Sequence, residues 1–249
     1  MNITVIMVVF GFRQARATNL KVLVMTSSKY HHFLPGFCYM FNEYWGIPAI
    51  IGTDTPIAQD LPDNFSIHSY SGWKPLPAHH WSSGLRLALK SIPDGLVTIL
   101  LEDYYLIEPV KKDVVDLGIE MFHQFPNSLL RFDLTSDRQY NGHAKDLGKS
   151  GDIELVETPH TSEYQMSFQA GIWNRRLLLS IVPGGATPWL TEVGIQPPER
   201  MRVFGTKQHP VRYTNVVKSG GEEELFTVTY DGIPEHNMQV MRERGWTDE

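Results

Sequence analysis

Cysteine is almost absent from this chain of 249 residues, because Cys38 is the only one. A single cysteine excludes an internal disulfide framework and every metal site built from several cysteines, and it is typical of a reducing compartment. Glycine-rich phosphate loops are lacking as well, since the sequence contains neither G-x-G-x-x-G nor G-x-x-x-x-G-K-[ST]. Any phosphate must therefore be bound by another arrangement of residues.

Long hydrophobic runs are also lacking. The apolar stretch 3–12 is far shorter than the roughly 20 residues that a membrane helix needs. Its basic neighbours, Arg13 and Arg16, follow the run instead of preceding it, which is the wrong order for a secretory signal. We interpret residues 1–18 as a strand or an extension upstream of the domain. We expect a cytoplasmic protein without integral membrane contact, in the host cytoplasm if the gene is viral.

An excess of basic residues is missing too, because the formal net charge is -6. This charge argues against a protein whose main task is to coat nucleic acid. The length and the hydrophobic content of 42% are sufficient for a substantial core. We expect one α/β domain over residues 19–220, followed by a tail, 221–249, that packs on or near it. The sequence does not indicate an oligomeric state.

The apolar run Leu96–Leu101 leads directly into Glu102 and Asp103. Pro93 and Pro109 bound this segment, which predicts a strand buried on both faces in the middle of a parallel sheet. Ligands of open α/β sheets bind beyond the carboxyl ends of the strands. Two carboxylates there are well placed to hold a hard cation and, through it, a phosphate. Taken alone, the pair could equally be an acidic strand end that faces solvent.

The rest of the chain supplies the alternating strands and helices of such a sheet. The predicted strands are residues 19–25, 48–52, 66–70, 128–134 and 164–173. The predicted helices are residues 33–45, 81–89, 110–125 and 174–181. Residues 135–159, rich in Gly, Asp, Lys and Ser, predict a long irregular insertion. The fold class is therefore α/β, with a mostly parallel, Rossmann-like sheet flanked by helices.

Four segments, in this order, resemble a group of small glycosyltransferases with the GT-A fold. They are Trp81-Ser82 before a helix, the strand-end Glu102-Asp103-Tyr104, the Gln-x-x-x-Trp-x-Arg segment Gln169–Arg175, and the Pro-Trp-x-x-Glu segment Pro188–Glu192. In that group the strand-end pair before an aromatic residue stands in for the D-x-D motif of larger relatives. The resemblance covers about residues 19–220. It implies a single GT-A domain that moves a sugar from a nucleotide-diphosphate sugar, with a UDP-sugar as the expected donor, to a hydroxyl acceptor.

The chemistry of this transfer assigns roles to individual residues. The negative charge of the departing diphosphate must be neutralised, and we predict that Mn²⁺ or Mg²⁺ does this with Asp103 as its direct ligand. Glu102 either supports Asp103 from behind or touches the sugar. His209 is predicted to complete the metal shell. In an inverting transfer a carboxylate must take the acceptor's proton, and Glu192 is the candidate; the sequence leaves open whether the transfer inverts or retains the anomeric configuration. Alternatively, Glu192 is an acid stabilised at a helix N-terminus.

The candidate donor-binding residues lie after predicted strands, in a closing loop, and in segment 199–220, where five basic residues stand against one acid. They are Thr26, Ser27, Lys29, Arg131, Asp133, Trp189, Arg200, Arg202, Lys207 and Arg212.

Two other classes stay open. A nucleotidyltransferase uses the same sheet and a strand-end acid, but it normally has a glycine-rich, basic loop after the first strand, and residues 26–32 contain no glycine. A non-catalytic carbohydrate-binding module needs no metal, so the replacement of Asp103 by Asn should leave it unaffected. The acceptor also stays open between a saccharide or polysaccharide and a 5-hydroxymethylpyrimidine base in viral DNA, whose backbone the basic segment could follow.

Overall fold

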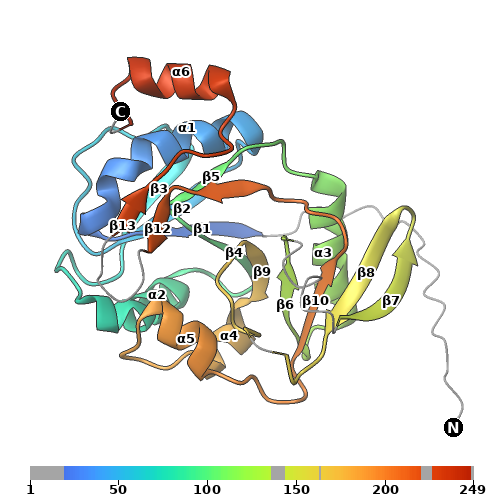
Figure 1. Cartoon of the computed structure of the whole chain (residues 1–249). Coiled ribbons are helices and arrows are strands. Elements are labelled where there is room, and N and C mark those ends of the chain that lie inside the picture. Colours follow the sequence, from blue (N-terminus) through green and yellow to red (C-terminus); the bar gives the residue numbers. More distant parts are fainter. Residues whose placement is uncertain (1–19, 136–143, 163, 220–225, 248–249) are drawn as a thin grey trace, which may run out of the picture.

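A nine-stranded sheet forms the centre of the protein in the computed structural model, which describes residues 20–135, 144–162, 164–219 and 226–247. The strand order is β3-β2-β1-β4-β9-β6-β10-β8-β7 (Figure 1). The strands are β1 (Lys21–Met25), β2 (Ala49–Thr53), β3 (Phe65–Ser69), β4 (Leu96–Leu101), β6 (Leu129–Asp133), β7 (Lys145–Ser150), β8 (Ile153–Thr158), β9 (Gly171–Asn174) and β10 (Arg202–Thr206). Strands β1 to β4 are parallel to one another, β9 is antiparallel to both β4 and β6, and β6 is parallel to β10.

Helices cover both faces of this sheet, because the side chains of each strand alternate between two apolar clusters. In β1, Val22 and Val24 belong to the cluster that includes α1 and α3, whereas Leu23 and Met25 belong to the cluster that includes α2 and α4. The helices are α1 (Leu34–Tyr44), α2 (Trp81–Ser91), α3 (Lys112–Gln124), α4 (Arg175–Ile181), α5 (Pro188–Gly194) and α6 (Glu235–Glu243). The predicted fold class, a mixed α/β fold with a large, mostly parallel sheet flanked by helices, is confirmed.

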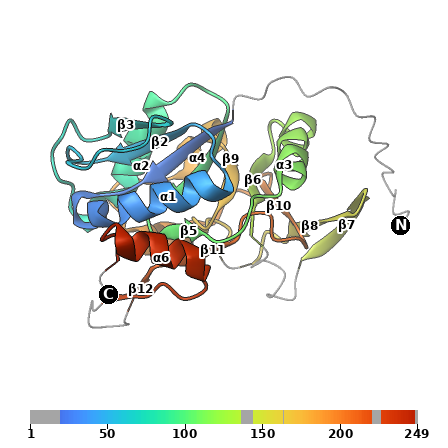
Figure 2. The same cartoon turned by 90° about the horizontal axis from the view of Figure 1, so that it is seen from above.

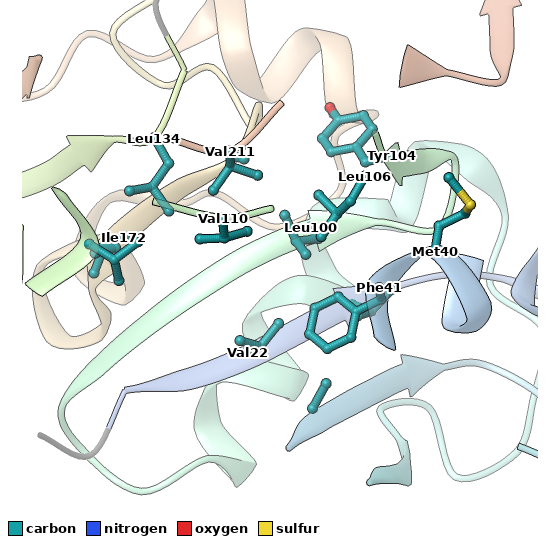
Figure 3. Packing of buried hydrophobic residues seen from close by; sticks show 14 of the residues in the cluster. Val22, Met40, Phe41, Leu100, Tyr104, Leu106, Val110, Leu134, Ile172 and Val211 are labelled. Atoms are coloured by element: carbon teal, nitrogen blue, oxygen red, sulfur yellow. The ribbon is translucent and has the colours of Figure 1, made fainter. Parts of the chain in front are cut away.

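Strand β4 occupies the middle of the sheet, as its continuous apolar run predicts. It is parallel to β1 on one side and antiparallel to β9 on the other. Val97, Ile99 and Leu100 are completely buried. Figure 3 shows Leu100 packed among core residues that include Val22 of β1 and Phe41 of α1. The core therefore fixes the position of the two acids that follow this strand.

Two sequence predictions about the later part of the chain are wrong. The expected irregular insertion 135–159 contains the hairpin of β7 and β8, which turns at Gly151 with a φ of 59° and extends the sheet beyond β10. The predicted strand 164–173 is limited to β9, because side chains of Glu192 and Arg131 bond the backbone of residues 168 and 169 and hold this segment as a turn.

The last part of the chain folds back over the sheet. Strand β11 (Tyr213–Asn215) pairs with β5 (Tyr104–Leu106), and β13 (Phe226–Val228) pairs with β12 (Val217–Ser219). Helix α6 lies beside α1, where the buried Asn237 accepts a hydrogen bond from Tyr44 (2.8 Å) and donates one to Tyr39 (3.1 Å) (Figures 1 and 2).

The predicted extension 1–18 lies outside the described residues. Within the described part of the chain, no helix combines the length and the apolar character that crossing a membrane requires.

Candidate active site

The carboxyl ends of β1, β2, β4 and β6 meet at one edge of the sheet, because these four strands point in the same direction. Polar or acidic residues stand at each of these ends. They are Thr26 after β1, Asp54 after β2, Glu102 and Asp103 after β4, and Asp133 at the end of β6. This is the edge at which α/β sheets bind their ligands.

Glu102 and Asp103 form an acidic pair that is poorly compensated by its surroundings. Glu102 is 6% exposed and accepts a hydrogen bond from the side chain of Thr26. Burial, and then the neighbouring Asp103, raise the pKa of Glu102 well above its usual value. Burial also raises the pKa of Asp103, which is partly exposed, to about 7. A bound cation would remove this electrostatic cost, so the pair is suited to a positively charged ligand.

The oxygen ligands of this pair fit Mg²⁺ or Mn²⁺. Among the described residues, however, no three Asp, Glu, His or Cys side chains come close enough together to hold a metal ion by themselves. A cation bound at Asp103 would take its other ligands from water and from the phosphates of a substrate, as Mg²⁺ commonly does.

The raised pKa of Glu102 predicts a pH-dependent cost of folding. Between the normal and the raised pKa, the folded state holds a proton that the unfolded state has lost, so stability falls as pH rises through this window. Glu102→Gln should remove this cost and raise the thermal midpoint at about pH 8 by roughly 2–6 °C. For a domain of this size, each kcal/mol of free energy of unfolding shifts the midpoint by about 2–4 °C. At about pH 4, below the normal pKa, the two midpoints should nearly coincide.

Thermal unfolding followed by circular dichroism between these pH values measures the difference. Glu199→Gln, at an exposed position, is the matched control and should leave the midpoint unchanged. A lower midpoint for Glu102→Gln at alkaline pH would show that the ionised carboxylate stabilises the fold instead of straining it.

Tyr104 connects the acidic pair with two other predicted site residues. Its ring stacks on Tyr213 with 4.4 Å between the centroids. The pKa of its hydroxyl is raised mainly by burial and also by the charges of Asp103 and Glu192, while Arg131 lowers it. The charges of Asp103, Glu192 and Arg131 therefore all act on one buried tyrosine.

Glu192 is the fifth of the seven residues of α5. The alternative interpretation as an acid of the first helical turn is therefore wrong. Its Oε1 accepts a hydrogen bond from the backbone N–H of Phe168 (2.5 Å), which fixes the direction of the carboxylate. The side chain is partly exposed and lines a pocket of about 360 Å³.

The three residues that define the Gln-x-x-x-Trp-x-Arg segment lie in three different parts of the structure. Gln169 lies at the site, where its side chain accepts a hydrogen bond from the Tyr213 hydroxyl (3.0 Å) and its carbonyl accepts one from Arg131 (3.1 Å). Trp173 is completely buried in the core. Arg175 lies at the opposite edge of the sheet and bonds the end of α2 and Asp94. Of the three, only Gln169 is placed to act at the site.

Arg131 and Asp133 form a buried ion pair at the end of β6, with each side chain 1% exposed. The guanidinium also lies over the ring of Trp173, 4.9 Å from its centroid. Because its side chain is enclosed, Arg131 influences the site through its hydrogen bond to Gln169 and through its charge, which lowers the pKa of Tyr104.

The predicted basic residues are dispersed, and three of them have carboxylate partners. Arg202 forms two hydrogen bonds with Glu157 of β8 (2.6 and 2.8 Å). Lys207 pairs with Asp146 (3.3 Å), and Arg212 with Glu108 (2.8 Å).

The other predicted residues lie at separate positions. Arg200 is exposed, and His209 is partly buried between β10 and β11. Ser27 precedes the 3₁₀ helix η1 (Ser28–Phe33), and the exposed Lys29 lies over the ring of Phe226 (4.2 Å). Donor binding by Ser27, Lys29 and Arg200 stays a prediction. His209 was predicted to complete the metal shell, but among the described residues it does not form a metal-binding group of three with Glu102 and Asp103.

Sequence reasoning missed Asp54, which is 1% exposed and connects two loops at this edge. It accepts hydrogen bonds from the backbone N–H groups of Ser28 (2.8 Å) and Leu76 (3.2 Å). The signal was present, since an acid directly follows the second strand just as Asp103 follows β4 within two residues.

No protein-family model and no curated protein sequence matches this chain. Among solved structures, it is similar to a cytidylyltransferase from Leptospira borgpetersenii, with 10% identity, a TM-score of 0.45, and coverage of 92% of this chain and 95% of that one. It is also similar to TarS from S. aureus, with 12% identity and a TM-score of 0.42 over 77% of this chain, which spans only 37% of TarS. Both similarities are distant, so the function is inferred from the residues of the site itself.

Proposed function

We propose that this protein is a metal-assisted glycosyltransferase that moves a sugar from a nucleotide-diphosphate sugar, with UDP as the preferred nucleotide, to a hydroxyl acceptor. The observation that supports this function most is the acidic pair Glu102 and Asp103 at the carboxyl end of β4, where burial raises the pKa of both carboxyl groups. Such a transfer needs groups that stabilise the departing diphosphate and a base for the acceptor, and the strand-end carboxylates and the separate carboxylate of Glu192 on α5 are suited to these roles.

Each of these residues has a role in this proposal. A divalent cation, when bound, would neutralise the charge of the departing diphosphate. Asp103 is the direct ligand because it is partly exposed, and Glu102 supports it from the interior, held by Thr26. Ser27 and Lys29, in the segment after β1, face the nucleotide.

Glu192 acts on the acceptor. The hydrogen bond from Phe168 orients its carboxylate, which takes the proton of the acceptor hydroxyl while the oxygen of that hydroxyl forms its bond to the sugar. The bond between the sugar and the diphosphate breaks, and the electron pair of that bond leaves with the diphosphate. Arg131, which is paired with Asp133, bonds the carbonyl of Gln169, and the Gln169 side chain bonds Tyr213, which stacks on Tyr104.

Calorimetry with nucleoside diphosphates tests the proposal. We expect UDP to bind in the presence of Mn²⁺ at least about tenfold more tightly than in its absence, because the cation joins the diphosphate to Asp103. Failure of UDP, GDP, CDP and ADP to bind with Mn²⁺ present would end the enzyme interpretation. A nucleotidyltransferase would instead release pyrophosphate from a nucleoside triphosphate and a sugar phosphate, which a coupled pyrophosphate assay detects.

A further inference from the structure

A pocket of about 360 Å³ is lined by residues of α5, including Glu192, by the residues that follow this helix, and by the loop before β9. Besides Glu192, its polar lining consists of residues with three hydroxyl side chains and one amide, which are Thr161, Ser162, Tyr164 and Gln196. Val193 and Ile195 supply apolar surface. Its volume is at the small end of the range of small-molecule sites, about 300–1,000 Å³.

The walls of this pocket are connected to each other. The Gln196 side chain donates a hydrogen bond to the carbonyl of His160, and His160 Nε2 donates one to the carbonyl of Pro197. The Gln165 side chain bonds the carbonyl of Pro159 (2.5 Å) and closes the loop on itself. The segment after α5 and the loop before β9 are therefore held together, so the pocket is formed before a ligand arrives.

The charge of the pocket restricts the chemistry of its ligand. Among the described residues that line it, Glu192 is the only charged one, and there is no lysine or arginine. Recognition of nucleic acid normally depends on basic side chains that contact phosphates, and a carboxylate repels them. Hydroxyl and amide groups, which both donate and accept hydrogen bonds, match the hydroxyl groups of a neutral sugar.

An exposed tryptophan extends this surface. Trp189 and Val193 are four residues apart on α5, so they share one face of the helix. Val193 lines the pocket and is 42% exposed, and Trp189 is 61% exposed. An indole ring in this position gives a sugar ring a flat apolar surface on which to pack.

We infer that the pocket beside Glu192, together with the face of Trp189, is the acceptor subsite and takes a neutral saccharide instead of a base in DNA. This inference rests on the proposed function and goes further, because it chooses between the two acceptor classes and assigns Trp189 to the acceptor. The acceptor hydroxyl then approaches Glu192 from the pocket that this carboxylate lines.

Saturation-transfer NMR on the whole chain tests this inference. The probes are the methyl glycosides of glucose, galactose, mannose and N-acetylglucosamine, and an oligodeoxynucleotide that contains 5-hydroxymethylcytosine. We expect at least one glycoside to bind and the oligonucleotide not to bind. Gln196→Ala and Trp189→Ala should each weaken glycoside binding by about tenfold, as expected for the loss of one hydrogen bond or one ring contact.

Leu87→Ala is the matched control, because Leu87 is an exposed apolar residue on α2, away from the pocket. It should bind glycosides like the unaltered protein. The inference is overturned if no glycoside binds, if the oligonucleotide binds and Gln196→Ala weakens it, or if both pocket variants bind glycosides normally. UDP binding with Mn²⁺ is measured on the same unaltered protein. If UDP binds and the glycosides do not, only the assignment of the acceptor subsite fails. If the glycosides bind and UDP does not, the proposed transferase activity is overturned, but the pocket remains a saccharide-binding site.

Discussion

Asp103→Asn is expected to lower both sugar transfer and nucleotide-sugar hydrolysis by about 10³-fold, the loss typical of removing one strong electrostatic contact to the developing charge. Asparagine has nearly the same size as aspartate, but it lacks the charge that would hold a cation between the protein and the diphosphate. Calorimetry with UDP and Mn²⁺ should show that the advantage conferred by the metal is lost. Turnover assays with UDP-sugars measure the decrease in rate.

The opposite end of the same strand provides a control for this prediction. Asp94 precedes β4, is exposed, and pairs with Arg175 at the edge of the sheet away from the site. Asp94→Asn should keep full activity. Because burial raises the pKa of Asp103 to about 7, Asp103→Asn should also unfold at the same or a higher temperature than the unaltered protein at alkaline pH. Loss of activity together with a lower midpoint would indicate a structural role, and undiminished metal-dependent turnover would exclude Asp103 as the metal ligand.

The sequence predicts the centre of this fold well, because strong local patterns determine it. The run Leu96–Leu101 has no polar side chain apart from Thr98, and such a run is stable only when both of its faces are covered. Since the strand ends where the apolar run ends, the pattern also places Glu102 and Asp103 at the ligand-binding edge. The position of a strand end is thus a local property that can be predicted.

The hairpin of β7 and β8 was not predictable from hydrophobicity in the same way. Strand β7 is an edge strand with mostly exposed side chains, and it is stabilised by backbone pairing with β8 and not by burial. Its charged residues, such as Lys145 and Lys149, are typical of protected sheet edges. The turn at Gly151 between two six-residue segments was the available signal.

Contacts between distant segments explain why only part of the site was predicted. Tyr213 reaches Tyr104 and Gln169 because β11 pairs with β5, and no local pattern in the sequence indicates this pairing. Segment 199–220 shows the same limit for charged residues. Its local excess of basic residues suggested a phosphate patch, but Arg202 pairs with Glu157 of β8, which lies far away in sequence. Local composition gives the charges of a segment and not their partners.

Glu192→Gln is expected to lower the kcat of transfer by about 10²–10⁴-fold, which is the usual contribution of a general base. Glutamine keeps an oxygen that accepts the N–H of Phe168, so α5 and the Gln169 segment should stay in place, but it cannot take a proton from the acceptor. The affinity for the acceptor should therefore change far less than kcat does. Steady-state kinetics with varied acceptor concentration separates the two effects.

Glu192→Ala distinguishes this catalytic role from a purely positioning one. Alanine removes both the proton acceptor and the hydrogen bond to Phe168, whereas glutamine removes only the former. If Glu192 is the base, the two variants should have similarly low kcat values, because either change eliminates proton transfer. If Glu192 only positions the backbone, glutamine should restore nearly full activity and alanine should not. That second pattern would transfer the role of base to another group, and the saccharide in the pocket would then require a different residue to activate its hydroxyl.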